Sequence, residues 1–242
     1  MRSYRQFPKI FGSLLCLILA APQGQCPMEP SNTIRWRAGA PNCEFQRGDD
    51  DRYRWRMTNG DVDMTLIVDS QELAKSRHRL HHPLGVYLSV TYTGHDKFEF
   101  PAGLRMQFVR HHNVAEGHLD PDQFSTRLQN DIDTLVFDTE RENKKHPEKA
   151  EEKTALAREY QKEASEFIEF ISTQSLQEAI LTPGNPEVHG WVFFRTDNNK
   201  WLGPWKSRED FILRVKTKDN FWEFPFSLPP AEGDLILRKR DQ

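Results

Sequence analysis

The sequence lacks the short motifs by which many enzymes are identified. It has no G-x-S-x-G nucleophile elbow, no G-x-x-x-x-G-K-[ST] phosphate loop, no G-x-G-x-x-G dinucleotide fingerprint and no H-E-x-x-H zinc motif. Each of these motifs positions a nucleophile, a phosphate group or a metal-bound water for one type of reaction. Their absence removes the usual signs of catalysis, and we expect a protein that is not an enzyme and needs no cofactor.

Clusters of basic residues are also missing. The 242 residues carry a formal net charge of −3 and no tract of lysine and arginine. A surface that binds nucleic acid needs such a tract because it must neutralise phosphates. We therefore expect no nucleic-acid partner.

An apolar run long enough to cross a membrane, about 20 residues, is not found either. The run IFGSLLCLILAA at residues 10–21 follows a basic start, MRSYRQFPK. A basic segment followed by about 7–15 apolar residues is the layout of a secretory signal peptide. The sequence predicts a signal peptide within residues 1–26, with its cleavage site left open because Pro22 directly follows Ala21. We expect a secreted or periplasmic bacterial protein whose mature chain has no membrane span.

Removal of residues 1–20, which hold three basic and no acidic side chains, would take the formal charge from −3 to −6. Of the three cysteines, Cys16 lies in this segment, which leaves Cys26 and Cys43. An oxidising compartment permits a disulfide between these two, and the alternative is two unpaired thiols. A lipid anchor at Cys26 is disfavoured because QGQC lacks the small residue that usually precedes a lipidated cysteine.

Strand-like alternation, by contrast, is abundant. In DRYRWRM the large residues Tyr53, Trp55 and Met57 alternate with arginines, and Asn59-Gly60 follows as a hairpin turn. Further strands are expected in VDMTLIV, GVYLSVTYTG, LRMQFV, VHGWVFFRT, DFILRVK, NFWEFPFSL and DLILRKR. Short strands separated by glycine and proline turns indicate a mainly β protein, an antiparallel sandwich or barrel.

Between residues 120 and 173 the apolar period changes from two residues to three or four, which is typical of helices. Pro147 divides this stretch and fits only at a helix start. The pattern predicts an αα-hairpin over residues 120–173, inserted between the halves of one β domain at residues 27–119 and 174–242. Two apolar stripes carry this prediction: Phe124, Leu128, Ile132, Leu135 and Val136, then Leu156, Tyr160, Ala164, Phe167, Ile168 and Ile171.

One local stretch, LTPGNPEVHGWVFF, resembles the Pro-Gly turn and following x-G-x-V-x-F strand of immunoglobulin-like sandwich domains in bacterial exported proteins. The resemblance implies an immunoglobulin-like antiparallel β-sandwich. It also implies the roles that such domains have, namely adhesion, ligand binding or a structural part in the envelope.

The stretch RHHNVAEGHLDPD at residues 110–122 is the strongest candidate for a metal site. His111, His112 and His118, with Glu116, are donor types that zinc prefers. Adjacent residues on a strand point to opposite faces, so His111 and His112 cannot both chelate one ion without a bend. His81-His82 has the same disadvantage. We favour the alternative, in which this stretch is a strand end followed by a helix that Asp120 or Asp122 caps.

The loop RTDNNKWLGPWKSRED is the candidate binding loop. Trp201 and Trp205 flank Gly203-Pro204, and Lys206 adds a positive charge. Exposed aromatic side chains on a loop can stack on sugars or anchor a protein partner. The alternative is that both indoles are buried at one end of the sandwich.

Two classes of function follow. The first is an exported, non-catalytic protein of the envelope that binds a protein or glycan or has a structural role. The second is a metal-dependent hydrolase in which His111, His112 and His118 hold zinc. We favour the first because the motifs of catalysis are missing.

Overall fold

A computed structural model of the chain describes residues 32–50, 52–69, 83–100, 103–196 and 208–228. Every described residue belongs to one compact unit, Ser31–Gln242. The predicted signal peptide and the predicted strand DLILRKR lie outside the described residues.

The first sheet has five strands in the order β1-β12-β11-β7-β8. All its pairings are antiparallel except that of β1 with β12, so the sheet is mixed rather than purely antiparallel. The strands are β1 (Thr33–Arg35), β7 (Leu104–Phe108), β8 (Val114–Gly117), β11 (Glu209–Lys216) and β12 (Phe221–Leu228).

Pro225 explains why β1 is so short. The Glu223 carbonyl accepts from the Trp36 N–H at 2.9 Å, and the Phe221 N–H donates to the Asn32 carbonyl at 3.0 Å. Alternate residues of a strand direct their backbone groups to the same side, so Pro225 also faces the β1 side. Proline has no N–H to donate there, which is why pairing with β1 stops.

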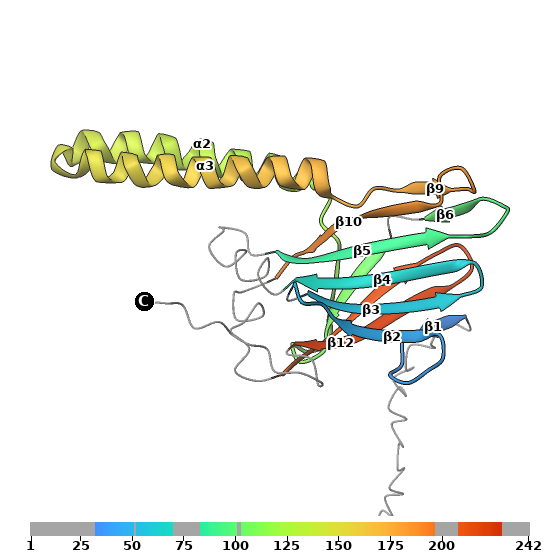
Figure 1. Cartoon of the computed structure of the whole chain (residues 1–242). Helices are drawn as coiled ribbons and strands as arrows, with labels where there is room; N and C mark the ends of the chain where they lie inside the picture. Colours follow the sequence, from blue (N-terminus) through green and yellow to red (C-terminus); the bar gives the residue numbers. More distant parts are fainter. Residues whose placement is uncertain (1–31, 51, 70–82, 101–102, 197–207, 229–242) are drawn as a thin grey trace, which may run out of the picture. The chain divides into compact units, whose positions relative to one another are not determined.

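The second sheet also has five strands, in the order β10-β5-β4-β3-β2, and all its pairings are antiparallel. Figure 1 shows them side by side. The tight turn between β3 and β4 is Gly60-Asp61, with Gly60 at a φ of 58°, one residue later than the predicted Asn59-Gly60, because Asn59 still pairs with Val62. The strands are β2 (Cys43–Arg47), β3 (Arg52–Asn59), β4 (Val62–Asp69), β5 (Leu84–Tyr92) and β10 (Glu187–Phe194).

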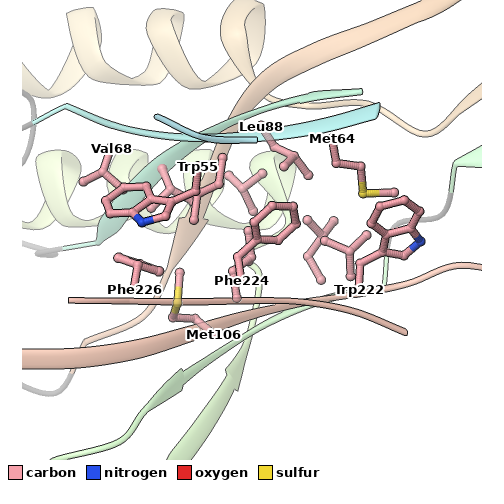
Figure 2. Packing of buried hydrophobic residues seen from close by; sticks show 14 of the residues in the cluster. Trp55, Met64, Val68, Leu88, Met106, Trp222, Phe224 and Phe226 are labelled. Carbon is pink, nitrogen blue, oxygen red and sulfur yellow. The ribbon is translucent and has the colours of Figure 1, made fainter. Parts of the chain in front are cut away.

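The core lies between the two sheets. Figure 2 shows Trp55 and Val68 directed toward Phe226, and the Trp55 and Phe226 ring centroids are 5.3 Å apart. The inward faces are those that the alternation predicted, because every second residue of a strand points the same way. Among these buried residues are Tyr53, Trp55, Met57, Val86, Leu88, Val90, Leu104, Met106, Phe108, Trp222, Phe224 and Leu228.

Two helices form an antiparallel hairpin where the apolar period predicted them. They are α2 (Pro121–Lys145) and α3 (Ala150–Gln174), joined by a short 3-10 turn, η1 (Pro147–Lys149) (Figure 1). Asp120 caps α2 by accepting a hydrogen bond from the Gln123 N–H at 2.9 Å, and Pro121 lies in the first turn. Leu156, which we expected in the apolar stripe of α3, is 59% exposed.

The root of the helical hairpin, where α2 begins and α3 ends, packs on the second sheet. Phe124 and Leu128 of α2 and Phe167 and Ile171 of α3 form one buried cluster with Phe193 of β10. This cluster is separate from the core between the sheets. The chain leaves the hairpin into β9 (Ala179–Leu181), which pairs with β6 (Phe98–Phe100) in a small two-stranded sheet.

The described residues therefore form a mainly β protein with two helices, as the sequence predicted. Among the described residues, no helix is both long and apolar enough to cross a membrane.

Candidate functional site

The predicted binding loop cannot be placed, because Trp201, Trp205 and Lys206 lie outside the described residues. The same is true of Cys26 and of the pair His81-His82. Cys43 is a half-buried free thiol at the start of β2. Its bridge to Cys26 stays a prediction.

The histidine-rich stretch is a hairpin turn rather than a simple strand end. The Val114 N–H donates to the His111 carbonyl at 3.1 Å, and His112 and Asn113 between them both have a φ of 57°. Two central residues with positive φ are the arrangement of a type I′ turn, which suits a β-hairpin. The next residues do not lead directly into the helix, as the sequence predicted, but form β8 beside β7.

The hairpin β7–β8 keeps the predicted metal ligands apart. The His111 N–H donates to the Phe108 carbonyl at one end of β7, and the His118 N–H donates to the Leu104 carbonyl at the other. These two ends are about 13 Å apart at the rise of a strand, so His111 and His118 lie at opposite ends of the hairpin. His111 instead lies 3.3 Å from the Glu209 carboxylate.

Glu116 of β8 pairs with Met106, and His112 is exposed in the turn. Among the described residues, no group of three or more histidine, cysteine, aspartate or glutamate side chains is placed to hold a metal ion. His118 lies elsewhere, in a recess that the prediction did not foresee.

This root recess lies where the chain passes from β8 into α2 and from α3 back toward β9, and its volume is about 230 Å³. Its buried apolar members are Phe100, Leu104, Val192 and Phe193, and its exposed polar members are Asp120, Gln177 and Glu178. The other lining residues are His118, Leu119, Pro121, Ser175, Leu176 and Trp191.

Strand β10 holds, by backbone hydrogen bonds, the two segments that form the root recess. We call the passage from β8 into α2 the first crossing and the passage from α3 toward β9 the second crossing. The Leu119 N–H donates to the Phe193 carbonyl at 2.7 Å, and the Leu176 N–H donates to the Trp191 carbonyl at 2.9 Å. Because β10 is the last strand of its sheet, these bonds satisfy edge groups that would otherwise be open to another strand.

Gly190 allows the second crossing to come close. A Cβ atom at this position would lie 2.5 Å from the Leu176 nitrogen and 2.9 Å from the Ser175 carbonyl carbon. Both are backbone atoms, so a side chain here would push the crossing away from β10. The glycine of the VHGWVFF motif is therefore the residue that sets the position of Ser175.

Ser175 is the most informative residue of the root recess. It follows α3 directly and is 8% exposed, and its hydroxyl has no hydrogen-bond partner among the described residues. A buried hydroxyl without a partner costs about 1–3 kcal/mol, so such groups are uncommon unless a ligand or water completes them.

The remaining polar side chains are also available to a ligand. Within the described part of the chain, no hydrogen bond engages the His118 ring or the Glu178 carboxylate. Asp120 uses one carboxylate oxygen, Oδ1, for its helix cap.

Ser175, His118 and Asp120 together are the residue types of a hydrolase triad. Such catalysis requires the hydroxyl to bond the imidazole and the imidazole to bond the carboxylate. No hydrogen bond among the described residues links the three. The arrangement offers groups that can recognise a ligand, without the connected chain that activates a nucleophile.

A second hollow, the edge cleft, is lined by the segment that follows β1, by residues of β2, β3 and β12, and by Arg208, and has a volume of about 350 Å³. Three of its polar side chains already have partners. The indole Nε1–H of Trp36 donates to the Glu44 and Arg56 carbonyls, and Arg208 and Ser227 both donate to the Asp210 carboxylate. Its lining residues are Trp36, Ala38, Gly39, Cys43, Phe45, Trp55, Arg208, Pro225, Phe226 and Ser227.

Asp210 shows how completely these polar groups are satisfied. Burial of its carboxyl acts to raise the pKa, but hydrogen bonds from Ser227 and Arg110 and the charge of Arg208 outweigh it and lower the pKa below its usual value. The edge cleft therefore has aromatic walls, and none of its described lining residues has a fully buried side-chain polar atom without a hydrogen-bond partner. The root recess has one, which is why we treat it as the candidate site.

Sequence reasoning singled out His118 as a zinc ligand and Asp120 as a helix cap, and it missed Ser175, Glu178 and Trp191. One signal could have found Ser175. The two ends of an antiparallel hairpin must meet, so residues just before position 120 and just after position 173 have to be neighbours.

Comparison with models of known protein families, with curated proteins and with solved structures finds no match to this chain.

Proposed function

We propose that this chain is an exported, non-catalytic binding protein and that the root recess holds its ligand. The observation that carries the proposal is the Ser175 hydroxyl, buried and without a partner in a hollow of about 230 Å³. A ligand that bonds this hydroxyl would remove the cost of leaving it unsatisfied.

The composition of the root recess supports a binding role. Binding sites for small molecules combine apolar walls with a few polar groups that fix orientation. Phe100, Leu104 and Phe193 supply buried apolar surface, and His118, Glu178 and Ser175 supply polar groups. One water occupies about 30 Å³ in the liquid, so the volume suits a small organic molecule.

Export is the second part of the proposal and is supported by the basic-then-apolar start of the chain. In a secreted or periplasmic setting, the partner of the whole molecule is an envelope protein or glycan. The hairpin of α2 and α3 is a contact surface for it, because insertions on a rigid scaffold often carry recognition. The finer fold type that we propose is an immunoglobulin-like sandwich, which two sheets packed over one core would suit.

A thermal-denaturation screen tests the ligand site. The chain without its first 26 residues is melted against small polar and charged molecules, next to Ser175→Leu and Leu156→Ala variants. Ser175→Leu fills the root recess, and Leu156 is 59% exposed on α3, away from the lining residues.

The proposal expects at least one compound that raises the Tm of the wild-type chain and of Leu156→Ala but not of Ser175→Leu. Circular dichroism of each variant checks that it is folded. Compounds that stabilise all three proteins equally, or no stabilising compound at all, would overturn the proposed site.

A further inference from the structure

We infer that the ligand of the root recess carries a protonated amine. This inference rests on the proposed function and names the chemical class of its ligand. Charge is the first argument. Among the described residues that line the root recess, two are carboxylates, Asp120 and Glu178, and none is lysine or arginine.

The two carboxylates have oxygen atoms that can accept hydrogen bonds from a ligand. Glu178 has no hydrogen-bond partner within the described part of the chain, and Asp120 commits its Oδ1 to the Gln123 N–H. An ammonium group has three donors and no acceptor, so it suits carboxylate oxygens and a hydroxyl that lacks a partner. Hydrogen bonds between an ammonium and a carboxylate are about twice as strong as those between neutral groups.

The Ser175 hydroxyl is the second, independent argument. It is 8% exposed, lines the root recess and has no partner. A hydroxyl accepts through its oxygen, so it can take an ammonium N–H. The Ser175 hydroxyl therefore adds a buried acceptor to the two carboxylates that line the root recess.

The aromatic wall is the third argument. Trp191 lines the root recess, and its ring centroid is 6.3 Å from that of Phe193, with the two planes 17° apart. These rings give the root recess an apolar wall, which suits the apolar body of an organic amine.

The edge cleft has a different character. Arg208 lines it, and its carboxylate neighbour Asp210 is already bonded to Arg208, Arg110 and Ser227. Since a cation there would meet a guanidinium rather than an open carboxylate, the preference for amines belongs to the root recess.

Isothermal titration of the chain without its first 26 residues tests the inference with three probes of similar size. These are benzylamine, benzyl alcohol and benzoate, which carry a positive charge, no charge and a negative charge on the same ring. Two variants remove one recess charge each, Glu178→Gln and Asp120→Asn. Asparagine caps helices as well as aspartate does, so Asp120→Asn retains the start of α2.

Glu159→Gln is the matched control, because it removes a charge from an exposed residue of α3 that does not line the root recess. We expect benzylamine to bind at least about tenfold more tightly than benzyl alcohol, given the strength of charge-assisted hydrogen bonds. Either recess variant should weaken benzylamine several-fold and leave benzyl alcohol unchanged, whereas Glu159→Gln should change neither.

Each of the following results would refute a specific part of the proposal. Equal or tighter binding of benzyl alcohol or benzoate, abolished by Ser175→Leu, would refute the amine preference and leave the binding site in place. Benzylamine binding that Glu178→Gln and Asp120→Asn do not alter would also refute the preference. Binding of no probe, with no stabilising compound in the thermal screen, would refute both the preference and the proposed function.

Discussion

Ser175 and Ser227 are two serines that are at most 9% exposed, and they differ in their surroundings. The Ser227 hydroxyl donates to the Asp210 carboxylate at 2.7 Å, whereas the Ser175 hydroxyl has no partner. Removing a hydroxyl that lacks a partner relieves a penalty, but removing a bonded one leaves its partner unsatisfied.

Alanine at these two positions should therefore have opposite effects. Without ligand, we expect Ser175→Ala to leave the free energy of unfolding unchanged or to raise it by about 1 kcal/mol. Ser227→Ala should lower it by about 1–3 kcal/mol. Urea denaturation of both variants measures the difference, and a Ser175→Ala variant as unstable as Ser227→Ala would mean that the Ser175 hydroxyl is bonded in the folded protein.

Gly190 is the residue on which the second chain crossing depends. We expect Gly190→Ala to lower the free energy of unfolding by about 1–3 kcal/mol, because the added methyl group would meet the backbone of Ser175 and Leu176. Gly184→Ala is the control, since a Cβ there has nothing within 4 Å. Equal stability of the two variants would show that the crossing does not lie against β10.

At the scale of elements, the helical hairpin has a root that packs on the sheet and an outer part whose buried residues belong to the helices themselves. Phe124, Leu128, Phe167 and Ile171 contact β10 through Phe193. Farther along, the Asn143 side chain bonds Thr154, and Glu142 pairs with Lys153. These outer contacts join one helix to the other.

Two deletions should distinguish the role of the root from that of the outer part of the helical hairpin. Replacing residues 136–156 with a short Gly/Ser linker should leave a folded protein with an intact root recess, because the cluster with Phe193 is retained. Replacing residues 121–174 should expose Phe193 and Trp191 and remove the recess. Thermal melts and benzylamine titration measure both effects, and loss of cooperative unfolding in the shorter deletion would contradict this division.

The long elements could be predicted because each has one period over many residues. Tyr53, Trp55 and Met57 alternate through β3, and the helices repeat at three or four residues. The short strands β1, β6, β8 and β9 have three or four residues each, too few to establish a period. The root recess could not be predicted, because it depends on where these short segments meet.

At the scale of the whole molecule, the proposed export makes a prediction about the mature chain. The basic start and apolar run of residues 1–21 should direct secretion and be removed. Intact-mass measurement on protein from its native host should find a chain that begins between residues 21 and 27. A full-length species in the cytoplasm would contradict export without bearing on the root recess.

The central claim is that the root recess, and not the edge cleft, binds the ligand. Each hollow has a tryptophan, Trp191 in the root recess and Trp36 in the edge cleft. The indole N–H resonances of the six tryptophans can be labelled with ¹⁵N and distinguished by Trp191→Phe and Trp36→Phe variants. Their shifts report which hollow a probe enters.

The most direct measurement is therefore the ¹⁵N–¹H spectrum of the tryptophan-labelled chain during titration with benzylamine, benzyl alcohol and benzoate. The proposed site predicts that the Trp191 signal moves in a saturable way with any probe that binds, that Ser175→Leu abolishes the movement, and that the Trp36 signal stays in place. A probe that moves Trp36 and leaves Trp191 unchanged, or a Trp191 signal that no probe moves, would contradict the claim.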